Sequence, residues 1–413
     1  MGSTSTEALK IMRDEVKQEL LTDIIPFWKK LRDDNYGGYY GWLSYDLKLD
    51  EKAEKGCILN SRITWFFANA YTLFKNGYIT EEECQAAGFS GEDLLKEARH
   101  GYEFLMNHCL DKECGGIYWS LNYDGTPLDT TKHTYNQAFC IYALSSYYEA
   151  SGDEDALSLA HTLFHMIEEK CTDEVGYLEA FTREFAPESN EKLSENGVLA
   201  DKTMNTLLHV FEAYTELYRV AGDAEVKERL MWMMSIFAEK VYNPKAQRQE
   251  VFFDAEYNTI LDLHSYGHDI ETAWLIDRGV EVLKEAACEA RMSPITKILT
   301  KRIHQIAFDG RSLANECDRG VVNANRVWWV QAETLVGFLN GYEKSPECSE
   351  YRDGALAQWE FIKEYVIDKR VGSEWFWEVN PDGSPIDGRP IVEPWKCPYH
   401  NGRMCFEVIR RIQ

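Results

Sequence analysis

The sequence predicts an all-α protein, an (α/α)6 barrel of about twelve helices with short β-hairpins in the loops at the mouth of a central cavity. Long stretches with the periodicity of amphipathic helices dominate the chain. Between them, short extended segments recur at similar intervals. The starts of alternate helices carry polar, aromatic and histidine residues, which favours a closed ring around a shared cavity over an open helical solenoid.

The helical elements extend over most of the chain without a break in composition. No Pro/Ser/Gly-rich linker or low-complexity tract separates them, so we expect one domain over residues 1–413. The clearest apolar periodicity lies in residues 7–31, 58–74, 134–150, 203–220, 270–286, 326–342 and 355–369.

Six extended segments alternate with these helices, at 37–46, 115–125, 176–185, 250–258, 309–318 and 373–383. Several show aromatic alternation followed by a turn signal such as YDG or NPDG, which is typical of a hairpin. Successive segments start about 78, 61, 74, 59 and 64 residues apart. A unit of helix, hairpin and helix repeated six times predicts six helix pairs with all hairpins at one mouth.

Composition and charge exclude several classes of partner. The formal net charge is −25, whereas nucleic acids and anionic membrane surfaces require clustered Lys and Arg. No apolar run approaches the roughly 20 residues that cross a bilayer, and the first residues lack the pattern of a signal peptide. The 11 cysteines show no CxxC pair, which indicates reduced thiols. We therefore expect a cytoplasmic protein, acting as a monomer, that binds neither nucleic acid nor membrane.

Aromatic residues make up 13% of the chain, with 12 Trp and 23 Tyr. Sugar rings present apolar faces that pack on aromatic side chains, and their hydroxyls need polar partners. The aromatic content therefore fits a sugar-binding cavity, although an aromatic core would explain it equally well.

The stretch HSYGHDIE (264–271) is the most informative local pattern. On a helix, His264, His268 and Glu271 would share a face. Two histidines four residues apart resemble a zinc site, but the general-base Glu of HExxH is absent and no third ligand follows at short spacing. Proton transfer fits better, with Glu271 orienting His268 and with His264 hydrogen-bonding at the helix start. We expect no metal.

His400 is the expected partner of His268. It lies in the last inner segment, which a closed barrel places next to the first segments. Bases on opposite sides of one carbon can remove a proton from one face and return it to the other, which inverts the stereocentre.

The starts of the other alternate helices supply further candidates. Arg62 either lines the cavity or forms a buried salt bridge. His133 is interpreted as a structural residue. At most one of Trp328 and Trp329 lines the cavity, because adjacent helical residues diverge in direction. The complete set includes Arg62, His133, Tyr135, Asn136, Asn205, His209, Arg326, Trp328, Trp329, Glu333, Trp395 and Arg403.

Five motifs carry a resemblance to a known family: SRITWFFANAY, KHTYNQAFCIYAL, LHSYGHDIETAWL, RVWWVQAE and PWKCPYHNGRMC. They resemble the N-acylglucosamine 2-epimerase superfamily, and within it the group that acts on cellobiose and related disaccharides. The resemblance covers almost the whole chain. It implies an (α/α)6 barrel and cofactor-independent epimerisation at C2 of the reducing-end glucose of β-1,4-linked disaccharides, with lactose as a further substrate.

The resemblance also implies roles for individual residues. His268 and His400 match the two acid/base histidines, Glu271 the family's glutamate, Arg62 the arginine near the reacting oxygens, and His209 a third histidine. The substrate-binding residues implied by the match are Tyr135, Asn205, Trp328 or Trp329, and Trp395.

One departure and three alternatives remain at this stage. Gly197 stands where some members carry an acidic residue, so contacts to the second sugar are uncertain. The alternatives are a glycoside hydrolase using two cavity carboxylates such as Glu271 and Glu333, a monosaccharide epimerase or isomerase of the same superfamily, and a non-catalytic sugar-binding protein. The last gives no reason for His268, Glu271 and His400 to occur together.

Overall fold

The computed structural model describes residues 2–193 and 197–413. None of the helices in these ranges is both long and apolar enough to span a bilayer. The α-helices are α1 (Gly2–Glu19), α2 (Ile25–Lys30), α3 (Cys57–Lys75), α4 (Glu81–Ala86), α5 (Gly91–Phe104), α6 (Thr134–Ser151), α7 (Glu154–Lys170), α8 (Met204–Ala221), α9 (Ala224–Ile236), α10 (Tyr266–Leu283), α11 (Ala286–Ile306), α12 (Trp328–Lys344), α13 (Ser349–Phe361) and α14 (His400–Arg411).

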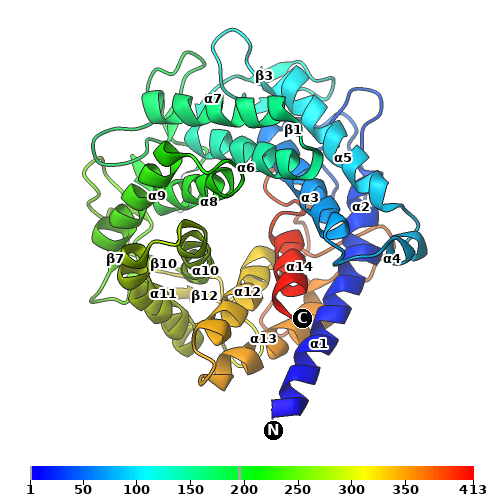
Figure 1. The fold of residues 1–413 in the computed structure, drawn as a ribbon, viewed down its shortest axis with the longest axis vertical. Helices are drawn as coiled ribbons and strands as arrows, with labels where there is room; N and C mark the ends of the chain where they lie inside the picture. The colour runs from blue at the N-terminus through cyan, green and yellow to red at the C-terminus, as the bar shows by residue number, and fades with distance from the viewer. Residues whose placement is uncertain (1, 194–196) are drawn as a thin grey trace.

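Alternate helices form a closed inner ring within the described residues. Each of α3, α6, α8, α10, α12 and α14 packs against the next, and α14 packs back against α3 (Figure 1). The outer helices α5, α7, α9, α11, α13 and α1 each pack mainly against one inner helix. Because α1 lies against α14, the two ends of the chain complete the same helix pair (Figure 1). The predicted (α/α)6 barrel is thereby confirmed.

The burial pattern explains which helices lie inside. In α6, the side chains from Thr134 to Tyr147 are all buried, because neighbouring inner helices and an outer helix cover every face. The outer helix α5 instead buries one stripe that includes Leu94, Ala98 and Tyr102, at the spacing of a helix with one apolar face. Ser90 begins α5 with a capping box.

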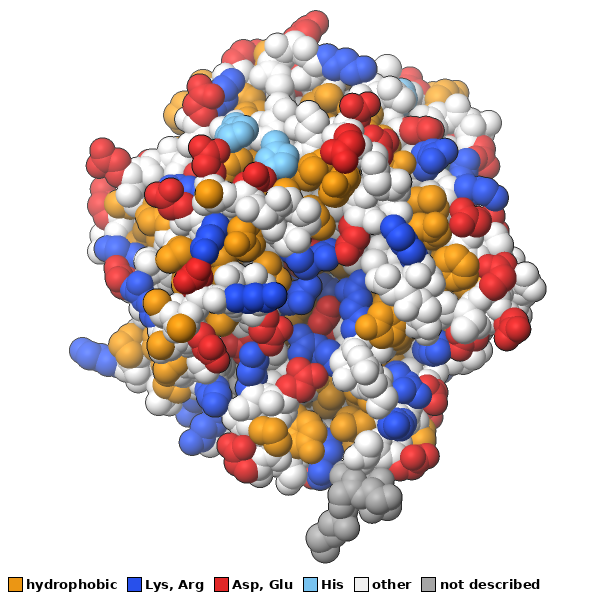
Figure 2. Space-filling view, viewed as in Figure 1, with side chains coloured by type: hydrophobic (Ala, Val, Ile, Leu, Met, Phe, Trp, Pro, Cys, Tyr) orange, Lys and Arg blue, Asp and Glu red, His pale blue; other side chains and the backbone are white. Residues whose placement is uncertain are grey.

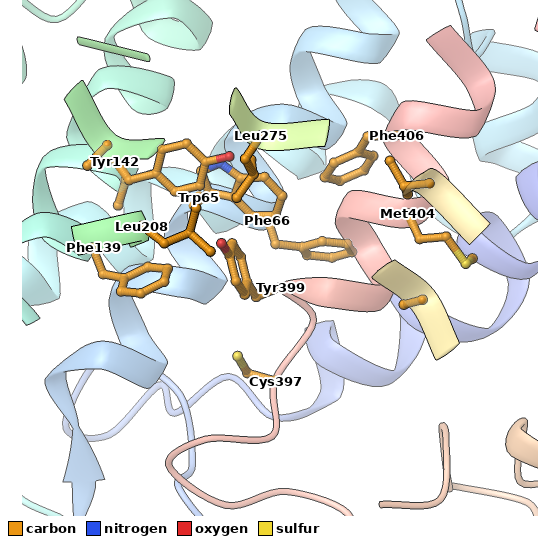
Figure 3. Close-up of a cluster of buried hydrophobic side chains, with 14 of the residues drawn as sticks. Trp65, Phe66, Phe139, Tyr142, Leu208, Leu275, Cys397, Tyr399, Met404 and Phe406 are labelled. Carbon is orange, nitrogen blue, oxygen red and sulfur yellow. The ribbon is translucent and has the colours of Figure 1, made fainter. Parts of the chain in front are cut away.

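Aromatic side chains fill the centre of the ring. Figure 3 shows Trp65, Phe139, Tyr142, Tyr399 and Phe406 meeting there from different inner helices and the segment before α14. The rings of Trp65 and Tyr142 stack with centroids 5.2 Å apart.

A small residue allows α14 to approach α3 closely. A Cβ at Gly402 would lie 2.5 Å from the Phe66 ring, so any larger residue would push the two helices apart.

Short strands connect neighbouring repeats at one end of the barrel. The strand before an inner helix pairs with a strand of the following repeat, and an isolated bridge between Leu43 and Val392 joins the last repeat to the first. The strands are β1 (Lys55–Gly56), β2 (Ser120–Leu121), β3 (Pro127–Asp129), β4 (Lys132–His133), β5 (Ala180–Phe181), β6 (Lys202–Thr203), β7 (Tyr242–Asn243), β8 (Arg248–Gln249), β9 (Phe252–Phe253), β10 (Leu263–Ser265), β11 (Glu316–Asp318), β12 (Val321–Asn323), β13 (Arg326–Val327) and β14 (Glu378–Val379).

A buried ion pair recurs beside these strands. In four repeats a cation two residues before the inner helix pairs with an aspartate whose carboxylate also accepts backbone N–H groups of its own turn. The pairs are Lys55–Asp33, Lys132–Asp111, Lys202–Asp173 and Arg326–Asp309. Each pair holds the chain in place just before an inner helix begins. Arg326, a candidate from sequence, has this structural role before α12.

The fourth repeat departs from this pattern in a way that explains His264. Asparagine replaces the turn aspartate at Asn243, and His264 occupies the position of the cation, two residues before α10. Nε2 of His264 lies 2.7 Å from Oδ2 of Asp269 in the first turn of α10. The prediction that His264 hydrogen-bonds at the helix start is confirmed.

The recurring ion pair gives a stability prediction at Asp111. Asp111 and Lys132 are fully buried and 3.0 Å apart, so Asp111→Ala leaves an unpaired buried ammonium. We expect a loss of about 3–5 kcal/mol of unfolding free energy, measured by urea denaturation. The double variant Asp111→Asn/Lys132→Met removes both charges and should recover part of the loss. A loss below about 1 kcal/mol for the single variant would contradict a structural role for the pair.

Candidate active site

The predicted site residues converge at the end of the barrel that carries the strands. They lie in the first turns of the inner helices or immediately before α14, so ring closure brings distant parts of the sequence together. These residues are Arg62 on α3, Tyr135 on α6, Asn205 and His209 on α8, His268 and Glu271 on α10, Trp328 and Trp329 on α12, Trp395 before α14, and His400 on α14.

His268 and His400 lie against the same indole ring. The ring centroid of Trp329 is 4.8 Å from that of His268 and 5.4 Å from that of His400. Trp329 is half-buried, whereas Trp328 is buried with Lys396 over its ring. Of the two tryptophans, Trp329 is therefore the one positioned to contact a bound molecule beside both histidines.

His400 is held by a carboxylate. Its Nδ1 lies 2.7 Å from Oε1 of Glu333, and Glu333 Oε2 accepts a hydrogen bond from Nε1 of Trp274 at 2.9 Å. A carboxylate favours the proton on Nδ1, which leaves the lone pair on Nε2 as the base. Burial, with Arg403 nearby, lowers the pKa of His400 well below its usual value, so the ring is neutral at pH 7.

His268 has a different partner from the one predicted. Its Nδ1 lies 2.7 Å from Oγ of Ser265, and no carboxylate bonds it among the described residues. Glu271 instead accepts a hydrogen bond from Arg403 and lies 3.8 Å from Nδ1 of His400. The prediction that Glu271 orients His268 is therefore wrong, because the carboxyl group of Glu271 bonds to Arg403 from another helix. Burial, and then His209, lower the pKa of His268 to about 3.

His209 is bonded on the same helix. Its Nδ1 lies 2.9 Å from Oε2 of Glu212, at the i+3 position. Burial raises the pKa of Glu212, but Arg403 and His209 outweigh it and lower the pKa to about 2. Glu212 is therefore ionised at every pH near neutrality and holds His209 through Nδ1.

Arg62 is a buried positive charge at the strand-bearing end of the barrel. It is 2% exposed and donates from Nη2 to the Tyr135 hydroxyl at 2.7 Å and from Nη1 to the Trp395 carbonyl at 3.3 Å. Among the described residues no carboxylate forms an ion pair with it, so the buried salt bridge considered from sequence is not formed. Its charge is thus available to an anionic group that binds beside it.

The remaining binding candidates lie on α6, on α8 and in the segment before α14. The ring of Tyr135 lies 6.0 Å from the half-buried Trp395 and 5.1 Å from His209. Asn205 is half-buried, and its Oδ1 has no hydrogen-bond partner in the part of the chain that the structure describes. His133 is buried against the Trp119 ring, with centroids 4.6 Å apart, as expected of a packing residue.

The loop before α8 includes residues 194–196, which lie outside the described residues. Gly197 follows them with a φ of 73°, a conformation that favours glycine over the acidic residue expected from other family members. The departure expected from sequence, that Gly197 alters contacts to a second sugar, stays a prediction.

Arg403 is the main feature that sequence reasoning left without a role. It donates to three carboxylates, those of Glu212, Glu271 and Glu333, the last at 2.7 Å. The sequence shows only short spacings within single helices: Arg403 follows His400 by three residues, and Glu212 follows His209 by three. Neither spacing reveals a contact across the ring.

One group of side chains has the composition of a metal site. Ligand atoms of Glu271, Glu333 and His400 lie within 4.8 Å of one another. The guanidinium of Arg403 already donates to both carboxylates, and Nδ1 of His400 is bonded to Glu333. The protein's own cation thus occupies the position that a metal would take, and the expectation of metal-free activity stays a prediction.

Glu271 gives a testable dependence of stability on pH. Burial, and then the neighbouring Glu333, raise the pKa of Glu271 to about 8. Between about pH 4.3 and 8 the folded state therefore binds a proton that the unfolded state has released, so the stability contributed by this group falls as pH rises through that window and levels off above about pH 8. Glu271→Gln removes this titrating group. We therefore expect the melting temperature of the variant, measured relative to that of the unaltered protein at the same pH, to increase between pH 6 and 9.

Calorimetry across that pH range measures the effect. The exposed Glu256→Gln is the matched control, and its curve should run parallel to that of the unaltered protein. Parallel curves for Glu271→Gln as well would show that Glu271 is ionised throughout.

Comparisons with known proteins agree with the geometry. The chain is 50% identical to cellobiose 2-epimerase of Ruminococcus albus over 97% of this chain and 99% of that protein, and 46% identical to the one of Eubacterium cellulosolvens over 97% and 98%. A crystal structure of a sugar epimerase from a ruminal bacterium superposes with a TM-score of 0.92 at 50% identity, covering 97% of this chain and 99% of that one.

The fold, the site and these relatives define a class: the protein is an enzyme that acts as a carbohydrate epimerase. The sequence profile of the N-acylglucosamine 2-epimerase family matches residues 38–401, and the chain belongs to that family.

Proposed function

We propose that this epimerase interconverts glucose and mannose at the reducing end of β-1,4-linked disaccharides. Cellobiose would become 4-O-β-glucosyl-mannose, and lactose would be a second substrate. The relatives named as cellobiose 2-epimerases support the substrate class. The observation that supports the mechanism most strongly is the placement of His268 and His400 beside the same Trp329 ring, each with Nδ1 engaged.

The proposed reaction begins with opening of the sugar ring. The C2 proton is acidic only next to a free C1 aldehyde, and His209 would move the hydroxyl proton during opening. One of His268 and His400 then removes the C2 proton as a neutral base. The electron pair moves into the C1–C2 bond and gives an enediolate. The other histidine takes up a proton from solvent on Nε2 and delivers it to the opposite face of C2, and the first histidine releases the abstracted proton to solvent.

Negative charge develops on O1 of the enediolate, and Arg62 would stabilise it. A preorganised cation acts most strongly at the atom that gains charge, and burial increases the effect. Trp329 and Trp395 would pack on the apolar faces of the two sugars, with Tyr135 and Asn205 as polar contacts. The scheme needs neither metal nor organic cofactor.

We infer a monomeric enzyme, with residues 1–413 forming one catalytic domain, that works in the cytoplasm. The cysteines, all within the described residues, are free thiols, which is consistent with a reducing compartment. Light scattering coupled to size exclusion tests the monomer directly.

Product identification tests the function. The protein, treated with EDTA, is incubated with cellobiose, and the products are resolved by NMR. We expect a disaccharide ending in mannose and no free glucose. Release of glucose would favour hydrolysis, activity only after addition of metal would overturn the metal-free scheme, and faster turnover of free glucose or mannose would favour a monosaccharide epimerase.

A further inference from the structure

A single guanidinium joins the carboxylates that hold two of the histidines. Nη1 of Arg403 donates to Glu212, which is bonded to Nδ1 of His209 at 2.9 Å. Nη2 donates at 2.7 Å to Glu333, which is bonded to Nδ1 of His400 at 2.7 Å. His209 and His400 come from α8 and α14, so Arg403 links two helices that are not neighbours in the ring.

Resting on the proposed function, we propose that Arg403 is a positioning residue for epimerisation. It fixes His209 and His400 through their carboxylates, while His268 is held independently by Ser265. A planar guanidinium has two nitrogens that can each serve a different carboxylate, whereas a lysine ammonium is a single point charge. The role therefore requires arginine at this position and not merely a positive charge.

A second opening of the barrel reaches Arg403 from the side opposite the strands. A cavity of about 360 Å³ lies among the last turns of the inner helices, where Arg219, Glu281 and Arg410 line it. Its inner wall includes Arg403 and Glu212. Figure 2 shows a hollow at the centre of the molecule in which basic and acidic side chains gather.

This opening permits a chemical test that leaves the substrate side untouched. Nε of Arg403 is buried without a hydrogen-bond partner among the described residues, and the side chain forms part of the cavity wall. In Arg403→Ala, the vacated space would join the distal cavity. A free guanidinium ion could then enter from that end and restore the bonds to Glu212 and Glu333.

We expect epimerisation of cellobiose by Arg403→Ala to fall by roughly 100-fold, because small misplacements of catalytic groups cost about that much. Millimolar guanidinium should restore activity several-fold without raising KM, since it enters at the other end. Arg403→Lys should lose activity similarly and should not respond to guanidinium. Arg410→Ala, in the same cavity but outside the carboxylate network, is the control and should show neither loss nor rescue.

Deuterium uptake at C2 distinguishes positioning from a general loss of structure. His268 is still held by Ser265 in both Arg403 variants and can still exchange the C2 proton. In D2O, the rate at which unconverted sugar takes up deuterium at C2, divided by the rate of epimerisation, should therefore rise in both variants. A lower fraction of folded protein would reduce both rates equally, and circular dichroism measures that fraction. Equal losses of exchange and epimerisation, or no rescue of folded Arg403→Ala, would overturn the inference. Absence of conversion by the unaltered protein would overturn the proposed function instead.

Discussion

His400→Asn should abolish epimerisation, with kcat reduced by about 10²–10⁴-fold, the contribution of a general acid or base. Inversion at C2 needs a proton taken from one face and returned to the other, so the loss of either base stops net conversion. Asparagine can still donate to Glu333, which limits structural damage. His268→Asn should have the same effect.

The neighbouring histidine supplies a matched control. His264 stands four residues before His268, but its Nε2 is bonded to Asp269. His264→Asn should lower the melting temperature and leave kcat of the folded protein close to normal. Steady-state kinetics measure kcat of the three variants, His400→Asn, His268→Asn and His264→Asn, and circular dichroism shows whether each is folded. A near-normal rate for folded His400→Asn would contradict the two-base scheme.

Arg62→Met should lower kcat by about 10²–10³-fold, the cost of removing one preorganised group that stabilises a developing oxyanion. The side chain is buried, and its described hydrogen-bond partners, Tyr135 and the Trp395 carbonyl, are uncharged. Its positive charge is therefore paired with a negative charge only when the enediolate forms, so KM should change much less than kcat.

Two further variants separate charge from packing at this position. Arg62→Lys keeps the charge and should recover part of the rate. Tyr135→Phe removes only the hydroxyl that accepts a hydrogen bond from Arg62. Its decrease in kcat should be smaller than that of Arg62→Met. A large rise in KM with unchanged kcat for Arg62→Met would show that Arg62 binds the ground state of the sugar instead.

The barrel was predictable from sequence because its repeat is visible in one dimension. Each hairpin segment carries its own turn signals, and each inner helix has a polar or aromatic start. Ring closure then dictates that Arg62, His209, His268 and His400 share one cavity, and the structure confirms that they gather at one end of the barrel.

The partners of these residues were predictable only in part. His264 hydrogen-bonds as expected because its partner, Asp269, is local. Glu271 does not hold His268, because Arg403, 132 residues further along the chain, attracts the carboxylate. Spacing along one helix identifies residues that share a face, but the direction of a buried charged side chain depends on the nearest opposite charge across the ring.

The choice between Trp328 and Trp329 shows the same limit of local pattern. Helical geometry predicts that adjacent side chains diverge, without indicating which faces the cavity. In the structure, Lys396 lies over Trp328 and covers it, while Trp329 stays partly exposed beside both histidines.

The most direct test of the two-histidine mechanism is the fate of hydrogen at C2. Cellobiose labelled with deuterium at C2 is converted in ordinary water, and the first product formed is analysed by NMR. Two bases predict that the glucosyl-mannose carries solvent hydrogen at C2, because the histidine that protonates is not the one that took the deuterium. Product that retains most of the deuterium at C2 would contradict the mechanism and would require transfer by a single base.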